Sequence, residues 1–349
     1  MNNRQILSFH SISGLIAGLF LILMGISGAV LVFQHDIEDI QWQQYIDVKD
    51  SNELNIDKGI QSIQKTYPYW DTRLIHFEKG EALIFNLRKP TARRFVFVDP
   101  VSGEIIKEID ELTTFTRWLL KFHYSLQAGP LGRIIVFIVG ILFLISLLSG
   151  IYLYRRSILK TLFFRTSILR KNTRSFYSSL HRTIGVWALI FNLLLVGTGI
   201  FLAFAVVRSG LNPPAAPQTP LVTASAEEIL QEIGKRHPNF SPTYIRLPLK
   251  NGAPLRVYGM YDDDLPVYSE FFNYFEADAA SAEIVNNQKI SEAGWVTKLD
   301  SMLIPLHFGQ YGGGFTKILY CLVGLTGPFL SVSGFVIWQK KRGSKRKRS

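Results

Sequence analysis

Hydrophobic residues are gathered into four long runs along the chain, and none of these runs contains Asp, Glu, Lys or Arg. A helix needs about 20 residues to cross a hydrocarbon core about 30 Å thick, and each run reaches that length. Buried helices of a soluble protein rarely give four such runs, so the pattern predicts four transmembrane helices. The first run is expected to stay in the protein as a helix instead of being cleaved as a signal peptide. The uncharged runs are 11–33, 134–154, 183–207 and 318–338.

The polar segments between the runs predict a helical membrane protein with two small α+β domains outside the membrane. A helical pattern is followed by strand-like segments in both cases. The expected helices are 56–67 and 226–237, and the expected strands are 74–77, 83–87, 94–99, 104–109, 254–258 and 270–277. The predicted organisation is transmembrane helices at 1–34, 131–156, 181–208 and 315–338, outer domains at 35–130 and 209–314, a basic loop at 157–180 and a basic tail at 339–349.

Charge predicts the orientation of these helices. The net charge is +11, and it is concentrated in 155–182, with eight basic and no acidic residues, and in 339–349, with seven basic and no acidic residues. An excess of Lys and Arg marks the cytoplasmic side of a membrane. We therefore expect a multi-pass inner-membrane protein with both termini in the cytoplasm and both polar domains in the periplasm. Anionic lipids are the expected partner of the basic segments, and no nucleic acid is expected.

Motif content excludes several kinds of redox centre. The single cysteine, Cys321, lies inside the fourth run, so no disulfide framework, covalent haem motif or iron–sulfur ligand set is expected. The chain also lacks the glycine fingerprint of a dinucleotide-binding domain, and no flavin or nicotinamide domain is evident.

The chain is an internal duplication of a helix–domain–helix unit. His10 and His181 begin equivalent helices, and His123 and His307 precede equivalent helices in the second half of each unit. Both copies start on the same side, so the repeat is parallel about an axis along the membrane normal. Matched positions include Gly14 with Gly185, Gly28 with Gly199, Gly129 with Gly313, and Ser149-Gly150 with Ser333-Gly334.

Four histidines therefore occupy duplicated positions, one pair toward each membrane face. Neutral imidazoles facing each other in a helix bundle can ligate a planar metal macrocycle from both sides. The alternative is a structural role at the membrane boundary, because duplication copies structural histidines as readily as ligands. His35 follows the first run on its outer side and is an alternative outer ligand. The many glycines of the spans either leave room for a flat ring or permit close helix packing, and packing is the simpler reading of the glycines alone.

At this point the residues carry a family resemblance. The segment Leu306-His307-Phe308-Gly309, followed by Lys317, Ser333-Gly334 and Trp338, resembles the PepSY-associated transmembrane helix family. Phe122-His123-Tyr124-Ser125 has the same pattern with Ser in place of Gly, and the helix starts at His10 and His181 resemble the family's other helix starts. The similarity covers nearly the whole chain, and the polar domains resemble PepSY modules.

The resemblance implies a cofactor and an activity. The family includes iron-regulated inner-membrane proteins and ferric-siderophore reductases that bind b-type haem. It implies haem ligation by His10, His123, His181 and His307, with two haems expected, and it leaves the pairing of these histidines open.

Transmembrane electron transfer is accordingly the expected function. Electrons from a separate cytoplasmic or membrane donor would reduce ferric iron in a periplasmic siderophore or other chelate, and Fe(II) is released because it prefers softer ligands. Trp118, Trp295 and Tyr311 are candidate substrate-binding residues, although aromatic residues also gather at membrane interfaces. The alternative function is a non-redox, membrane-anchored protein that binds a peptidase, a peptide or a chelate. A transporter is disfavoured, because the spans carry no charged residue for ion coupling.

Overall fold

The computed structural model describes residues 2–48, 53–211 and 216–346. Parts of the predicted domains at 35–130 and 209–314, the first residue and the end of the 339–349 tail lie outside the described residues. The chain divides into a helical unit and a sheet unit. The helical unit comprises 1–34, 119–212 and 306–349, and the sheet unit comprises 35–118 and 213–305.

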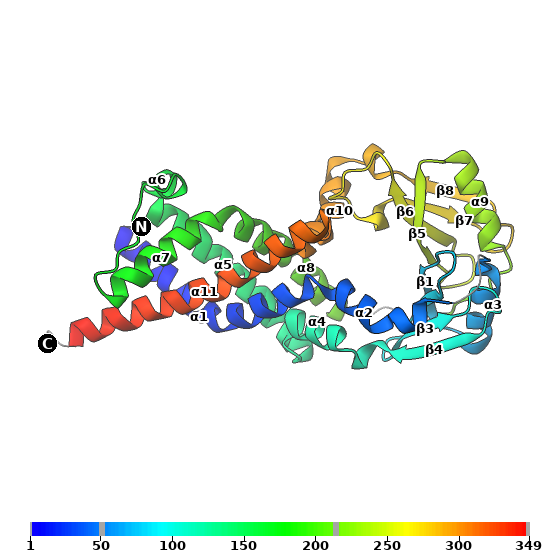
Figure 1. The fold of residues 1–349 in the computed structure, drawn as a ribbon, viewed down its shortest axis with the longest axis horizontal. Helices are drawn as coiled ribbons and strands as arrows, with labels where there is room; N and C mark the ends of the chain where they lie inside the picture. Colours follow the sequence, from blue (N-terminus) through cyan, green and yellow to red (C-terminus); the bar gives the residue numbers. More distant parts are fainter. Residues whose placement is uncertain (1, 49–52, 212–215, 347–349) are drawn as a thin grey trace. The chain divides into compact units, whose positions relative to one another are not determined.

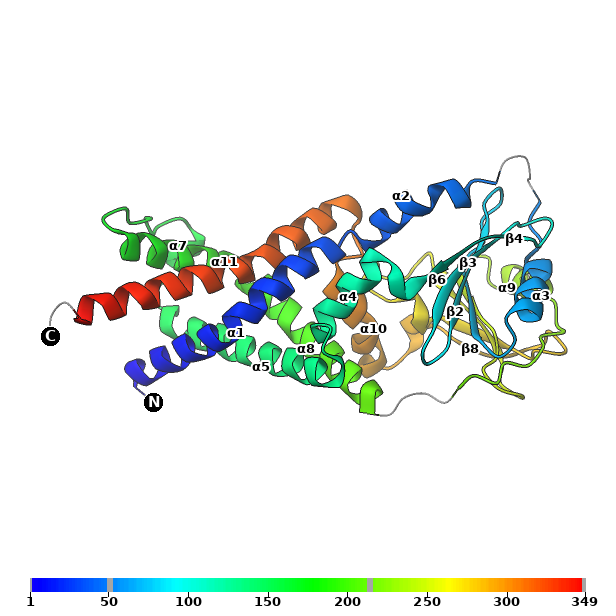
Figure 2. The ribbon, with the colours of Figure 1, turned by 90° about the horizontal axis from the view of Figure 1, so that it is seen from below.

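Four helices of the helical unit have the length and composition to cross a membrane. They are Asn3–Leu31, Gly129–Tyr154, Leu189–Leu211 and Gly313–Gly343. In the most apolar 18-residue stretch of each helix, only 17–28% of the residues are buried. Most apolar side chains therefore face outward, where lipid would surround them. Helix α1 packs against α5 and α11, α5 packs against α8, and α7 packs against α11 (Figure 2). The bounds are α1 Asn3–Leu31, α4 Phe115–Ser125, α5 Gly129–Tyr154, α6 Ile158–Leu162, α7 Thr173–Trp187, α8 Leu189–Leu211, α10 Trp295–Phe308 and α11 Gly313–Arg346.

The third predicted span is two helices instead of one. Helix α7, which carries His181, ends at Trp187, and α8 begins at Leu189. The side-chain amide of Asn192 donates to the carbonyl of Ala188 at 3.0 Å, beside the backbone bond to the same oxygen. A side-chain donor inserted into the helical ladder is a recognised cause of a local bend.

The sheet unit is built on one antiparallel sheet of eight strands. Its order is β4-β3-β2-β1-β5-β6-β7-β8, so each copy of the repeat supplies four neighbouring strands (Figure 1). Strands β1 and β5 join the copies, with Arg73 opposite Arg246 and Leu74 opposite Ile245. The strands are β1 Asp71–His76, β2 Leu83–Arg88, β3 Arg93–Val98, β4 Ile105–Asp110, β5 Phe240–Arg246, β6 Leu255–Tyr261, β7 Tyr274–Ala277 and β8 Ile284–Gln288.

The two domains predicted from the sequence are thus joined instead of separate. Helices α3 (Ile56–Thr66) and α9 (Ala226–Arg236) cover the same face of the sheet and share one hydrophobic core with strands of both copies. Helix α2 (Gln34–Ile46) places Trp42 on the other face, in a second cluster with Ile84 and Phe97. One four-stranded half is too small to bury a substantial core alone, and pairing at β1–β5 removes an exposed edge from each half.

The second half of the sheet departs most from the predicted strands. Strand β5 contains Pro242, which argues against a strand in the sequence, and the register shifts between Pro242 and Tyr244. The predicted strand at 270–277 begins instead with a 3₁₀ turn, Glu270–Phe272. Strand β8 was not predicted, because its residues are mostly polar and its inward positions are few.

The two copies also cap each other's helices. Asp57, in the first turn of α3, accepts hydrogen bonds from Ser225 Oγ at 2.5 Å and from the backbone N–H of Ala226 at 2.6 Å, where α9 begins. Glu227, in the first turn of α9, accepts from the backbone N–H of Ile56 at 2.6 Å. Helix N-termini carry unsatisfied N–H groups and a partial positive charge, so each carboxylate stabilises the start of the other helix.

We expect Asp57→Ala to destabilise the protein more than Glu227→Ala, because it removes two charge-assisted bonds instead of one. A lost cap costs about 1–2 kcal/mol, or about 2–4 °C in thermal midpoint for a unit of this size. The measurement is the thermal midpoint of the detergent-solubilised full chain. The control is Glu228→Ala, which removes an exposed carboxylate from the same turn of α9. Equal midpoints for all three variants would contradict reciprocal capping.

Candidate functional site

The helical unit brings the four duplicated histidines together in two pairs. The rings of His10 and His181 have centroids 6.2 Å apart and planes at 89°. The rings of His123 and His307 have centroids 6.4 Å apart and planes at 59°. Each pair takes one histidine from each copy of the repeat, so neither site is complete within one copy.

Turns between short and long helices position His123 and His307. His307 lies near the end of α10, which Gly309 terminates with a φ of 72° before α11 begins. A Cβ at Gly309 would also lie 2.7 Å from Cγ of Tyr320. In the first copy Leu126 and Gln127 take positive φ values in the equivalent turn. These turns let each histidine contact a different helix from the one that follows it in the chain.

A glycine of a neighbouring helix lies against each imidazole. A Cβ added at Gly199 would lie 2.9 Å from Cε1 of His307, and one added at Gly28 would lie 3.1 Å from Cε1 of His123. The equivalent distances at the other pair are 3.4 Å from Gly150 to His10 and 3.6 Å from Gly334 to His181. Close approach of the imidazole therefore favours glycine at Gly199 and Gly28, whereas the distances at Gly150 and Gly334 are ordinary van der Waals contacts.

The residue before each of these glycines carries a hydroxyl group that contacts Nδ1 of the same histidine. The distances are 3.1 Å from His10 to Ser149, 2.8 Å from His181 to Ser333, 3.0 Å from His123 to Ser27 and 3.1 Å from His307 to Thr198. Each of the four spans thus contributes one Ser-Gly or Thr-Gly seat for an imidazole. We call these four dipeptides the imidazole seats.

The hydrogen bonds of the imidazole seats assign the histidine tautomers. Each hydroxyl donates its own proton to a backbone carbonyl of its helix, as Ser27 does to Leu23 at 2.8 Å and Thr198 does to Leu194 at 2.8 Å. Ser149 and Ser333 donate in the same way to Ile145 and Leu330. With its proton given to the carbonyl, the hydroxyl oxygen accepts from the histidine, and this arrangement has the proton on Nδ1 and the lone pair on Nε2.

Two imidazoles with free Nε2 lone pairs could hold one metal between them. A metal–imidazole bond is about 2.0 Å long, so imidazoles on opposite sides of one metal have centroids about 6.3 Å apart. The observed separations of 6.2 and 6.4 Å match this spacing. No cluster of three or more His, Cys, Asp or Glu side chains suited to a metal occurs in residues 2–48, 53–211 and 216–346. Other ligands of a metal at either pair would have to come from a bound molecule.

A cavity adjoins the His10–His181 pair. Both histidines line it, together with Gly150, Tyr154 and Arg182. Nε of Arg182 is buried and has no hydrogen-bond partner in the described part of the chain. A buried guanidinium nitrogen without a partner is costly, so this cavity is suited to a ligand with an anionic group.

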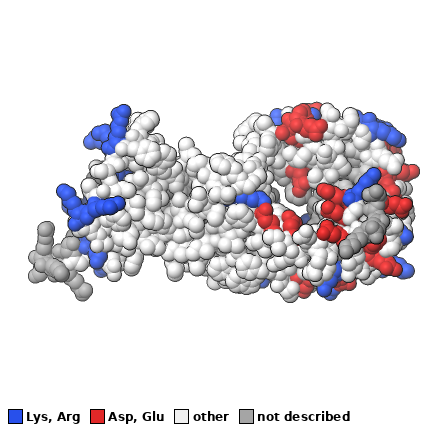
Figure 3. All heavy atoms as spheres, viewed as in Figure 1, with Lys and Arg blue, Asp and Glu red and all other residues white. Residues whose placement is uncertain are grey.

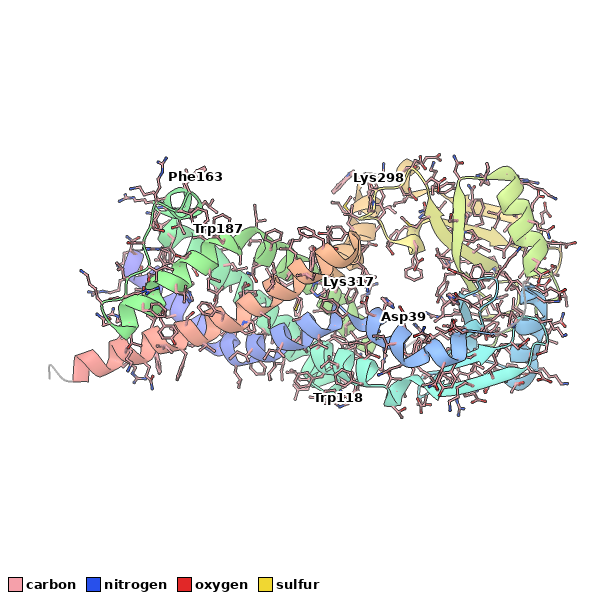
Figure 4. The ribbon with its side chains drawn as sticks, viewed as in Figure 1. Asp39, Trp118, Phe163, Trp187, Lys298 and Lys317 are labelled. Atoms are coloured by element: carbon pink, nitrogen blue, oxygen red, sulfur yellow. The ribbon has the colours of Figure 1, made fainter. Side chains whose placement is uncertain are left out.

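The remaining predicted site residues make other contacts. The side chain of His35 is 64% exposed, and its Nδ1 lies 4.0 Å from Glu38. Trp118, labelled in Figure 4, and Trp295 are both exposed aromatic residues of the sheet unit. Tyr311 contacts the hydroxyl of Tyr320 at 3.0 Å, and Tyr320 donates to the carbonyl of Leu306 at 2.8 Å. Tyr311 therefore supports the turn that holds His307.

The sequence contains a signal for the imidazole seats, a hydroxyl residue followed by glycine on each span. The glycines and the Ser-Gly pair of the second and fourth spans align in the repeat. A hydroxyl residue also precedes the aligned glycines of the first and third spans, at Ser27 and Thr198. Recognising one hydroxyl–glycine dipeptide on every span would have identified all four seats.

Comparison with protein families decides the family of the chain. The family model of the PepSY-associated TM region matches residues 7–341, which include all four paired histidines. The chain belongs to this family. This PepSY-associated protein is a multi-pass membrane protein, in agreement with its four long apolar helices. It is 25% identical over 262 residues to the uncharacterized protein PA4219 of Pseudomonas aeruginosa, and the match covers 65% of this chain and 64% of that relative.

The tautomer assignment can be tested in the metal-free PepSY-associated protein. We expect the four paired histidines to be neutral with the proton on Nδ1, because each Nδ1–H has a fixed acceptor. The measurement is ¹⁵N NMR of histidine-labelled protein in detergent, with signals assigned by His→Gln variants. A proton on Nε2 of the paired histidines would contradict the assignment.

Proposed function

We propose that this membrane protein binds two b-type haems and moves electrons across the inner membrane to ferric iron in a periplasmic siderophore or other chelate. One haem would be held between His10 and His181, and the other between His123 and His307. The observation that carries the proposal is the pair of imidazole–imidazole separations, 6.2 and 6.4 Å, at two duplicated sites. When bound, haem supplies one-electron chemistry through its iron.

The surroundings of the histidines support haem as the ligand. Hydrogen bonds from Nδ1–H to the imidazole seats orient each ring and raise the basicity of Nε2. The glycines of the seats let the imidazoles lie close to the helix backbones, and Arg182, partly buried beside the cavity, offers a cation to an anionic substituent. Cys321 is the single cysteine, so the proposed haems are non-covalent.

The spacing of the two pairs supports a path across the bilayer. Helix α1 carries His10 of one pair and Gly28, which contacts His123 of the other pair. These positions are 18 residues apart, which is about 27 Å along a helix and close to the thickness of a hydrocarbon core. The same interval separates His181 from Gly199.

The distribution of charge supports the proposed orientation of the protein in the membrane. Figure 3 shows Lys and Arg gathered at one end of the helical unit, with a long uncharged surface beyond them. This end includes the segment with eight basic and no acidic residues, 155–182. We infer that it is cytoplasmic, so that both termini and the His10–His181 pair lie on that side. The sheet unit, whose two halves we propose to be PepSY-like modules, is then periplasmic.

The proposed reaction needs a separate electron donor. Each Fe(III) ion takes up one electron and becomes Fe(II), and the chelating oxygens hold Fe(II) less tightly. A membrane quinol that gives two electrons reduces two ferric ions and releases two protons, and a reduced flavin serves in the same way. Among this chain's own residues, the histidines and the imidazole seats have the role of binding and orienting.

Visible spectra of the purified protein test the proposal. From haem-replete cells we expect a b-type reduced-minus-oxidised spectrum and about two haems per chain. His10→Ala and His181→Ala should each lose one and the same haem, and His123→Ala and His307→Ala the other. Dithionite-reduced protein should reduce a ferric hydroxamate, followed by trapping of Fe(II). A haem-free preparation would leave the non-redox binding function as the better reading, and losses that cross the pairs would overturn the pairing.

The glycine contacts give a matched pair of variants on one helix. Gly199→Val should lose the haem of the His123–His307 pair, because the added side chain occupies the position of the His307 ring. Gly197→Val is the control, because a Cβ at Gly197 meets nothing within 4 Å. Haem content and the thermal midpoint are measured for both variants. Equal haem content in the two proteins would show that the seat is not required.

A further inference from the structure

The face of the sheet opposite α3 and α9 carries a strip of arginines. Arg73 of β1 pairs in register with Arg246 of β5, and Arg246 pairs with Arg256 of β6. On the next row of the same face, Arg88 of β2 pairs with Arg93 of β3. Alternation along each strand sends these side chains away from the core that α3 and α9 cover. We call these five residues the arginine strip.

Aromatic clusters lie on both sides of the arginine strip. In the first half of the sheet, Trp42 packs on Phe95 and Phe97 with ring centroids 4.6 and 5.7 Å apart. In the second half, Phe271 packs on Tyr244 and Tyr258, at 5.2 and 5.7 Å. The strip is therefore a polar region between two apolar walls.

The carboxylates near the strip do not balance its charge. Asp71 is shared between Arg73, at 2.6 Å, and Arg246, at 3.0 Å. Burial raises the pKa of Asp71, but the hydrogen bonds from Arg73 and Arg246 outweigh it and hold that pKa below its usual value. Glu276 pairs with Arg256 at 2.5 Å. Two strand carboxylates thus pair with three arginines, although Asp71 lies opposite Arg88 in the strand register.

Arg88 has the least favourable surroundings of the strip. It donates to the neutral side chain of Asn86, and burial together with the cations of Arg73 and Arg93 lowers the pKa of Arg88 to about 10. Two acids lie beside it: Asp71, opposite Arg88 in the register of β1 and β2, pairs with Arg73 and Arg246, and Glu111 pairs with Arg93 at 3.5 Å and with Arg117 at 3.4 Å.

Arg117 adds a second and independent sign of a missing partner. Its Nε is buried without a hydrogen-bond partner in the described residues, although its other nitrogen contacts Glu111.

Partly buried cations beside one another are costly unless an anion compensates them. Guanidinium groups offer planar, paired donors that match carboxylates, and the tyrosines of the strip's wall present hydroxyl groups and ring edges. The side chains of Arg73, Arg93, Arg246 and Arg256 are 17%, 29%, 27% and 42% exposed, so a ligand can reach them from solvent.

We propose that the arginine strip binds the negatively charged, carboxylate-bearing part of a ferric chelate. The assignment of the anion as an iron chelate rests on the proposed function, whereas the assignment of an anion site rests on the strip itself. Arg88 is the central donor, because it lies between Arg73 and Arg93 and the acids beside it, Asp71 and Glu111, pair with other arginines. The bound carboxylates would compensate the excess charge and stabilise the sheet unit.

Gallium(III) citrate is the probe, because Ga(III) resembles Fe(III) in its ligands but is not reduced. The full chain in detergent is titrated calorimetrically, and its thermal midpoint is measured with and without the probe. We expect Arg88→Gln to weaken binding about 10- to 100-fold, as for loss of a charged hydrogen-bond donor. It should also abolish the rise in midpoint caused by the probe, without lowering the midpoint of the ligand-free protein.

Arg236→Gln is the matched control, since Arg236 is an exposed cation of the sheet unit paired with Glu232 at 2.6 Å. This variant should bind the probe as the unchanged protein does. A fall in the ligand-free midpoint of Arg88→Gln with unchanged affinity would show that Arg88 is structural, and would overturn the proposal. Equal binding of citrate alone, of inorganic phosphate and of gallium citrate would overturn the assignment to a chelate.

Failure of this inference and failure of the proposed function give different results. Binding of gallium citrate requires neither haem nor electron transfer, so a haem-free protein that binds it through Arg88 supports the strip and not the redox function. A haem-containing protein that reduces a ferric hydroxamate but binds gallium citrate with no dependence on Arg88 retains the redox function and overturns the strip.

Discussion

The bond from each imidazole Nδ1–H to a hydroxyl oxygen is the interaction on which the helical unit is organised. Each Ser or Thr hydroxyl lies within hydrogen-bond distance of a backbone carbonyl of its own helix, so it can donate there and accept from the ring. The ring is thereby held in one tautomer and one orientation, against a glycine that lets it approach the helix. These hydrogen bonds connect four helices to four histidine-bearing segments, and the residues that form them are duplicated in the two copies.

The duplication explains why the two histidine pairs resemble each other. Within the first copy, Ser27 of α1 contacts His123, and Ser149 of α5 contacts His10. The second copy repeats both contacts through α8 and α11. A pair forms only when the two copies come together, so assembly of the copies and completion of both two-ligand sites are one event. The sheet unit follows the same rule, because Asp57 and Glu227 cap helices of opposite copies.

The two units place charge in contrasting ways. In the helical unit, neutral buried side chains find partners one by one, as Asn192 does in Ala188 and Thr326, which suits a segment surrounded by lipid. In the sheet unit, guanidinium groups are gathered on one face, where Asp71 and Glu111 are each shared between two arginines. Gathering like charges lowers stability, and such an arrangement is typical of a binding surface whose ligand supplies the opposite charge.

Sequence alone determined the four apolar spans and the duplicated histidines, because hydropathy and repeat spacing are properties of neighbouring residues. It also indicated the helices α3 and α9 and the first four strands, where alternation is regular. It did not predict β5, because Pro242 hides the pattern until the bulge is seen, and it predicted two domains where one sheet joins the copies. The joining depends on the register of Arg73 with Arg246, and the seats depend on contacts such as Ser27 with His123, 96 residues apart. The hydroxyl–glycine dipeptides recur in the sequence, but local spacing does not say which histidine each one contacts. Only the tertiary structure therefore decided which histidines face each other and which arginines share a face.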